Sequence, residues 1–191
     1  MIIYHYFFID SFVFNAPMYS FNDSLLEFIR ILFITISGFL LALSYSKQKI
    51  ESYFLKRISV LAVSSFLISL VTFIFFSDVF IYFGIIHLIL FGNVFIYIFK
   101  FKPFYLLLFP LFLYIFPEVV HLKLIKKATL DYFPLFPYLI YFLASFVSFP
   151  YLSKVIPQKK PDLVSTVVKH SLLIYLIHPV VIFIYLQMYY R

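Results

Sequence analysis

The chain has 191 residues, of which 64% are hydrophobic and 24% aromatic, and its formal net charge is +7. Soluble domains contain about 45–50% apolar residues, so this composition excludes an ordinary soluble fold and predicts an integral, multi-pass protein of the cell membrane. Nucleic acid is excluded as a partner because the basic residues lie between apolar runs and form no single patch. The chain has no cysteine, which excludes disulfides and thiolate metal sites.

Seven apolar segments follow one another, and each is expected to be a membrane helix. They cover about residues 1–14, 25–46, 55–76, 79–99, 103–117, 132–153 and 165–190. The first and fifth are short for a crossing. The fifth also carries Pro110, which predicts a kink or a partly re-entrant path. The sequence therefore predicts an all-α, polytopic membrane helix bundle, formed by a single domain over residues 1–191.

The basic residues predict the orientation of this bundle. Ten of the 15 Lys and Arg residues fall in the loops of one side or at their edges. The positive-inside rule places that side in the cytoplasm, so the N-terminus is expected inside and the C-terminus outside.

Small residues predict where helices approach closely. Ser37 and Gly38 lie two turns after Arg30 in the second segment, and Gly84 and Gly92 are eight residues apart in the fourth. Glycines on one helix face allow a tight helix–helix contact, so we expect Gly38, Gly84 and Gly92 at such contacts. Asn93 is expected to form a hydrogen bond between helices.

Three histidines are predicted to lie between the midplane and the outer third of the membrane, on different helices: His5, His87 and His178. His178 is near the middle of the last segment, where an imidazole must face other helices or a polar cavity. Pro179 removes the backbone hydrogen bond to the Tyr175 carbonyl and predicts a kink there. These residues favour a polar cavity, and the alternative is that each histidine only bonds a neighbouring helix.

Acid–base chemistry suits these residues best. An imidazole accepts a proton near neutral pH, and a carboxylate can orient it. Asp10 is the carboxylate of the first segment, but at five residues from His5 it is about 140° around the helix and not on the same face. A metal is not expected, because the three histidines are far apart in sequence and lack a local ligand spacing. Arg30 and Asp131 are predicted on the same outer side, although a headgroup anchor and a helix-dipole contact explain them equally well.

Four blocks of the chain carry a family resemblance, in matching order and spacing: RILFITISGFLLALSYSK, YFGIIHLILFGN, DYFPLFPYLIYFLASF and KHSLLIYLIHPVVIFIY. In these blocks the chain resembles the prokaryotic branch of the heparan-α-glucosaminide N-acetyltransferase-like membrane proteins, within the wider transmembrane acyltransferase group. His5 is similar to the histidine of the family's first helix. The family's aspartate follows that histidine by four residues, whereas Asp10 follows His5 by five, and the family's charged entry motif is absent.

The resemblance implies transfer of an acetyl group from cytoplasmic acetyl-CoA to an amino or hydroxyl group of an outer-side sugar or glycolipid. It makes His5 the first candidate for the base, with Asp10, and His178 the first candidate for lining the cavity beside His87. We assign the acceptor to Arg30, Asp131 and Tyr132. The CoA phosphates are assigned to the basic residues of the cytoplasmic mouth: Lys56, Arg57, Lys102, Lys169 and His170. Positive-inside bias alone would also place cations there.

Two other functions stay open at this point. The chain is either a catalytically silent relative that binds or moves a small molecule or lipid, or a structural membrane subunit. Membrane lipid is a partner in every case, and assembly with further copies of the same chain is left open.

Overall fold

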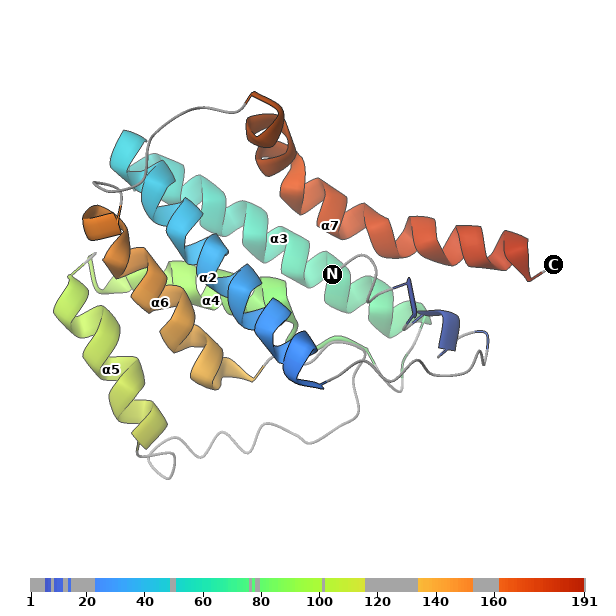
Figure 1. Ribbon diagram of the computed structural model, residues 1–191, viewed down its shortest axis with the longest axis horizontal. Coiled ribbons are helices and arrows are strands. Elements are labelled where there is room, and N and C mark those ends of the chain that lie inside the picture. The colour runs from blue at the N-terminus through green and yellow to red at the C-terminus, as the bar shows by residue number, and fades with distance from the viewer. Residues whose placement is uncertain are drawn as a thin grey trace. The chain divides into compact units, whose positions relative to one another are not determined.

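The computed structural model describes residues 6–7, 9–11, 14, 23–48, 51–75, 77, 80–100, 102–115, 134–152 and 162–190. All regular secondary structure in these ranges is helical, which confirms the all-α prediction (Figure 1). The helices are α2 (Asp23–Gln48), α3 (Glu51–Phe75), α4 (Ile85–Ile98), α5 (Pro103–Ile115), α6 (Leu135–Leu152) and α7 (Asp162–Tyr189). Residues 6–7, 9–11 and 14 are also helical.

The helix boundaries agree with the sequence prediction except at the fourth segment. This segment was expected to be helical from residue 79, but α4 begins at Ile85 and residues 80–84 are not helical. Gly84 is therefore the N-cap of α4, with extended backbone angles (φ −99°, ψ −171°), and does not share a helix face with Gly92. In α5, Pro110 lies inside one continuous helix and is buried.

Within the described part of the chain, two helices are long and apolar enough to cross a membrane, over Glu27–Tyr45 in α2 and Phe54–Ile74 in α3. The apolar stretches of α4 to α7 are shorter, at 10–17 residues each. Seven spans therefore stay a prediction, as do the orientation and the single domain. By its internal contacts the chain forms two compact units: residues 30–156, called here the central unit, and residues 1–29 with 157–191, called the terminal unit.

The central unit is held together around Phe142 of α6. In this unit α4 packs against both α3 and α6, and α5 packs against α6. A Cβ atom added at Gly38 of α2 would collide with the Phe142 carbonyl oxygen and with Ser145 Oγ. A Cβ at Gly92 of α4 would lie 2.6 Å from the Phe142 ring. The close contacts predicted for Gly38 and Gly92 are thus confirmed, and Phe142 fills the space between them with no exposed surface.

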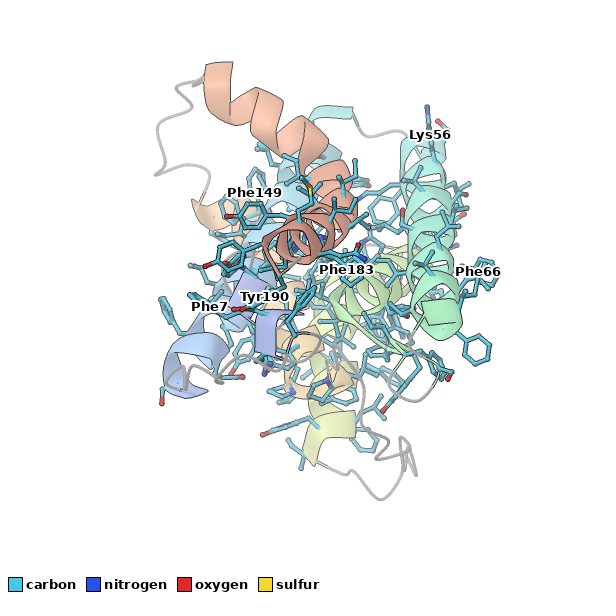
Figure 2. The ribbon with its side chains drawn as sticks, turned by 90° about the vertical axis from the view of Figure 1, so that its right-hand side faces the viewer. Phe7, Lys56, Phe66, Phe149, Phe183 and Tyr190 are labelled. Carbon is cyan, nitrogen blue, oxygen red and sulfur yellow. The ribbon has the colours of Figure 1, made fainter. Side chains whose placement is uncertain are left out.

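The outer surface of the central unit is apolar and rich in aromatic rings. Along α3, Val63, Phe66 and Phe73 are 59%, 66% and 53% exposed, and Phe104 of α5 is 66% exposed. Figure 2 shows Phe66 projecting away from α3. Large apolar side chains exposed along whole helices are typical of surfaces that meet a membrane or another protein.

In the terminal unit, helical residues near the N-terminus pack against the second half of α7. The Tyr6 and Tyr185 rings are 6.4 Å apart, and the Phe14 ring lies 6.2 Å from Phe183. Phe14 also stacks on Tyr190 at 4.9 Å with an interplanar angle of 14°. Phe183 and Tyr190 are labelled in Figure 2.

Candidate functional site

His178 is a buried imidazole on α7, 8% exposed. It shares a buried stripe with two apolar residues at helical spacing, Ile182 and Leu186. Its Nδ1 lies 3.1 Å from the carbonyl oxygen of Ile174, one turn earlier. A carbonyl oxygen only accepts hydrogen bonds, so Nδ1 carries the proton, and in the neutral ring the lone pair is on Nε2. Pro179 is predicted to leave the Tyr175 carbonyl without its backbone donor, but the carbonyl that His178 bonds is that of Ile174.

Asp10 lies in the same unit, in the helical residues near the N-terminus. The Tyr190 phenol donates a hydrogen bond to its carboxylate. The Oδ1 atom of Asp10 is buried and has no hydrogen-bond partner among the described residues. A buried carboxylate oxygen without a donor is costly, so this atom suits an added N–H or O–H group. His5 lies outside the described residues, and its spacing of five residues predicts that it is on another helix face from Asp10.

His87 is half-buried in the first turn of α4 and forms hydrogen bonds through both ring nitrogens. The backbone N–H of Gly84 donates to Nδ1 at 3.2 Å, and Nε2 lies 3.1 Å from Ser69 Oγ of α3. Ser69 Oγ in turn donates to the carbonyl oxygen of Ile81 at 2.6 Å. The Phe83 ring lies against the imidazole, with ring centroids 5.9 Å apart.

This network determines the protonation state of His87. The Gly84 N–H is a donor, so Nδ1 must accept and carries no proton. The single Ser69 proton is used on the Ile81 carbonyl, so Ser69 Oγ accepts from His87 Nε2–H. The imidazole is therefore neutral, with its proton on Nε2 and its lone pair already in a hydrogen bond. These contacts make His87 a clamp between α3 and the start of α4.

The predicted meeting of His5, His87 and His178 stays a prediction. His87 belongs to the central unit and His178 to the terminal unit, and His5 is outside the described residues. Asp131 and Tyr132 are outside them as well. Arg30 is half-buried in α2, as is Glu27 three residues before it. Among the described residues, no group of three or more His, Asp or Glu side chains could hold a metal ion.

The basic residues predicted for CoA lie partly at one end of the central unit. Phe54 of α3 and Tyr97 of α4 stack with ring centroids 6.4 Å apart, which brings the start of α3 beside the end of α4. Lys56 and Arg57 follow Phe54, and Lys102 follows α4. Lys56 is exposed and projects from α3 in Figure 2.

Arg57 and Lys102 are the best-defined cations at this end. Arg57 is half-buried, and its Nε is a buried donor without an acceptor among the described residues. Lys102 Nζ lies 5.9 Å from the Tyr105 ring centroid, a cation–π distance. Lys169 and His170 lie in α7, but their side chains are outside the described part of the structure.

Sequence reasoning missed the hydroxyl groups of α3. Ser65, Ser69 and Thr72 recur at i, i+4 and i+7, the spacing of one helix face. The Thr72 hydroxyl accepts the backbone N–H of Ile81 at 3.0 Å, while Ser65 bonds the Leu61 carbonyl of its own helix at 2.8 Å. The spacing was visible in the sequence, but the target of these hydroxyls was not.

Asn93 of α4 is also bonded differently from the prediction. It has no exposed surface, and its Nδ2 donates to the carbonyl of Ile89 in the same helix at 2.7 Å. Its Oδ1 is a buried acceptor with no partner among the described residues. The prediction that this side chain bonds another helix is therefore wrong.

Comparison with known proteins gives one match. No curated protein and no solved structure matches the chain. The family model described as heparan-alpha-glucosaminide N-acetyltransferase, catalytic, matches residues 1–180. This match indicates a membrane-associated protein with acetyltransferase-like activity, in a family whose general acyl donor is acetyl-CoA. Since the match covers nearly the whole sequence, the chain belongs to the heparan-alpha-glucosaminide N-acetyltransferase catalytic family.

Proposed function

We propose that the protein is a multi-pass membrane acyltransferase that moves an acetyl group from cytoplasmic acetyl-CoA to an amino or hydroxyl group of an outer-side sugar or glycolipid. The observation that carries the proposal is the family match over residues 1–180. The exposed apolar faces of α3 and α5 support the membrane setting, because lipid chains would cover them. The buried imidazole of His178 supports the chemistry.

The reaction requires one base. The base takes the proton from the acceptor amine or hydroxyl, whose lone pair attacks the thioester carbonyl of acetyl-CoA. The tetrahedral intermediate collapses, the C–S bond breaks, and CoA leaves as a thiolate, which takes the acceptor's proton from the protonated base. A base in this position typically contributes ~10²–10⁴-fold to the rate.

We assign the base to His5 or His178 and not to His87. His178 is buried, and the contact of its Nδ1 with the Ile174 carbonyl would hold the ring in one orientation. His5 keeps the better resemblance to the family, and the buried Oδ1 of Asp10 is an acceptor in the same unit. His87 would have to break its bond to Gly84 before it could accept a proton.

The CoA phosphates fit the basic end of the central unit. The Arg57 Nε donor lacks an acceptor among the described residues, and a phosphate oxygen is a charged acceptor that would satisfy it. Lys56 and Lys102 would add positive charge around the same group. We propose that Arg57 binds a phosphate directly and that the two lysines raise the local anion concentration.

Purified protein in lipid nanodiscs tests this proposal. Binding of acetyl-CoA is measured by calorimetry, and transfer is measured as CoA release with amino sugars and glycolipids as acceptors. We expect both, with binding weakened about tenfold or more in Arg57→Gln and unchanged in Lys126→Ala, a cation on the opposite predicted side. Binding without transfer to any acceptor would favour the silent relative, and absence of both would favour the structural subunit.

A further inference from the structure

The start of α4 poses a problem of length in a membrane. α4 has 14 residues, which at ~1.5 Å per residue span only ~21 Å of a hydrocarbon core about 30 Å thick. α3, with 25 residues, is about 37 Å long and needs no extension. Residues 80–84, called here the strap, connect toward α4 without forming a helix. Residues 82 and 83 bend, and the carbonyl of Ile81 and Nε2 of His87 both bond Ser69 Oγ, so the strap lies beside the first turn of α4, at the level of the apolar stretch of α3.

The strap lies at the level of the last turns of α3, below its end. The backbone of Ile81 contacts α3 on both of its polar groups: its N–H donates to Thr72 Oγ1 at 3.0 Å, and its carbonyl accepts from Ser69 Oγ at 2.6 Å. Both hydroxyls belong to the apolar stretch Phe54–Ile74. Ser69 is six residues, or about 9 Å, before the end of α3. The chain has therefore turned back along α3 before α4 begins.

The hydrogen bonds of the strap suit a place without water. Non-helical backbone is tolerated at membrane depth only where protein groups satisfy its N–H and C=O groups. Side chains satisfy three such groups here: Ile81 N–H, Ile81 C=O and, through His87, Gly84 N–H. These contacts meet that requirement for Ile81 and Gly84, and the Gly84–His87 contact also caps the start of α4.

Apart from Ser69, Thr72 and His87, the described side chains of α3 and α4 around the strap are apolar, and the nearest charged residue in sequence, Asp78, lies outside the described residues. The Phe80 ring packs edge-on against Phe73 of α3 at 5.3 Å, and Phe73 itself is 53% exposed. Among the described residues, α4, α6 and the part of α3 after Arg57 carry no Asp, Glu, Lys or Arg. Aromatic side chains with little charge are typical of the layer where a protein meets lipid headgroups and acyl chains.

We propose that the strap is inserted into the bilayer beside α3, so that the fourth span is a broken one: strap first, then the short helix α4. Its partner is the acyl-chain and upper headgroup layer of one leaflet. Ser69, Thr72 and His87 hold its backbone there, which gives these three residues a structural task that is separate from acyl transfer.

Single cysteines test the insertion cleanly, because the natural chain has none. Phe80→Cys is compared with Ser77→Cys, in the exposed turn after α3, and with Val63→Cys, exposed in the middle of the apolar stretch. Each variant is placed in phosphatidylcholine nanodiscs, where both faces are accessible, and treated with a charged thiol reagent. Total thiol is measured in SDS.

We expect Ser77→Cys to react fully, and Phe80→Cys to react at least tenfold more slowly and to resemble Val63→Cys. A fluorophore attached to the thiol of the Phe80→Cys variant should be quenched by lipids with a nitroxide on the upper acyl chain. Labelling of Phe80→Cys at the rate of Ser77→Cys, or no quenching by lipid nitroxides, would overturn the proposal.

The hydroxyl groups are tested in the Phe80→Cys background. Ser69→Ala with Thr72→Val removes both contacts to Ile81 with little change in volume, and should raise the labelling rate of the introduced thiol severalfold. Ser59→Ala is the matched control, since the exposed Ser59 bonds the carbonyl of Leu55 in its own helix at 3.0 Å. Circular dichroism confirms that the variants stay folded. Equal labelling in all backgrounds would show that these hydroxyls do not hold the strap.

Discussion

Two imidazoles in apolar helices, His87 at the start of α4 and His178 in the middle of α7, are bonded in different ways. His87 uses Nδ1 for a backbone N–H of the strap and Nε2 for a hydroxyl of another helix. His178 uses Nδ1 for a carbonyl one turn earlier in its own helix. The contacts of His87 join separate parts of the chain, whereas this contact of His178 lies within one helix. Loss of His87 should therefore reduce stability, and loss of His178, one of the two residues assigned as base, should reduce activity.

The sharpest test of this comparison is catalytic. His178→Ala and His5→Ala are each assayed for acetyl transfer, and the working base should lose ~10²–10⁴-fold in rate. Acetyl-CoA binding should persist, because the phosphates are assigned to the basic end of the central unit. His87→Ala should retain transfer within a few-fold once corrected for the folded fraction. Undiminished transfer in the double variant of His5 and His178 would refute both assignments.

The second prediction tests whether the close contacts of Gly38 and Gly92 with Phe142 stabilise the protein, in addition to the contacts of His87. Gly92→Leu places four carbons where one Cβ already meets the Phe142 ring, and Gly38→Leu places them against the Phe142 backbone. Overpacking of this kind typically costs ~1–3 kcal/mol, and the backbone contact should make Gly38→Leu the worse of the two. Thermal unfolding in detergent measures both.

Ala144→Leu on the exposed face of α6 is the control for this pair and should leave the melting temperature nearly unchanged. Equal melting of all three variants would mean that the contacts around Phe142 contribute little to stability.

The sequence predicted features that depend on local spacing and composition. Apolar runs predicted the helices α2 to α7 to within a few residues at most ends. Scarce glycines predicted the contacts at Gly38 and Gly92, because only a residue without Cβ allows such an approach. Local patterns could not predict the broken start of α4, since FIYFG is as apolar as a helix would be. Residues 80–84 stay non-helical beside α3, where Ser69 and Thr72 bond the Ile81 backbone. Such contacts are distant in sequence: Ser69 and His87, for example, are eighteen residues apart.

The site was harder to predict for the same reason. His87 and His178 look alike in sequence, each between apolar neighbours, and their roles depend on which atoms meet the ring. Asn93 shows the same limit: its burial was predictable, but its bond to Ile89 of its own helix was not.

The third prediction concerns the clamp itself. His87→Ala leaves the Gly84 N–H without its acceptor and Ser69 without its donor, and an unsatisfied buried group costs about 1–3 kcal/mol. Unfolding in detergent should show a loss of that size. His87→Gln, which can still accept and donate through its amide, should recover part of it. An alanine variant as stable as the parent chain would contradict the role of His87 as a clamp.

The smallest expected effect comes from removing the Ser69 contact of His87 while keeping its Gly84 contact. Ser69→Ala removes one hydroxyl but leaves Ile81 N–H bonded to Thr72 and Gly84 N–H bonded to His87. The carbonyl of Ile81 then loses its donor, and His87 Nε2–H loses its acceptor, so the change should cost about 1 kcal/mol, near the low end for unsatisfied groups. Ser59→Ala, whose hydroxyl bonds its own helix, should change stability by a few tenths at most. If Ser69→Ala destabilised the protein no more than Ser59→Ala, the bond between α3 and His87 would be incidental, and the contrast between His87 and His178 would rest on the Gly84 contact alone.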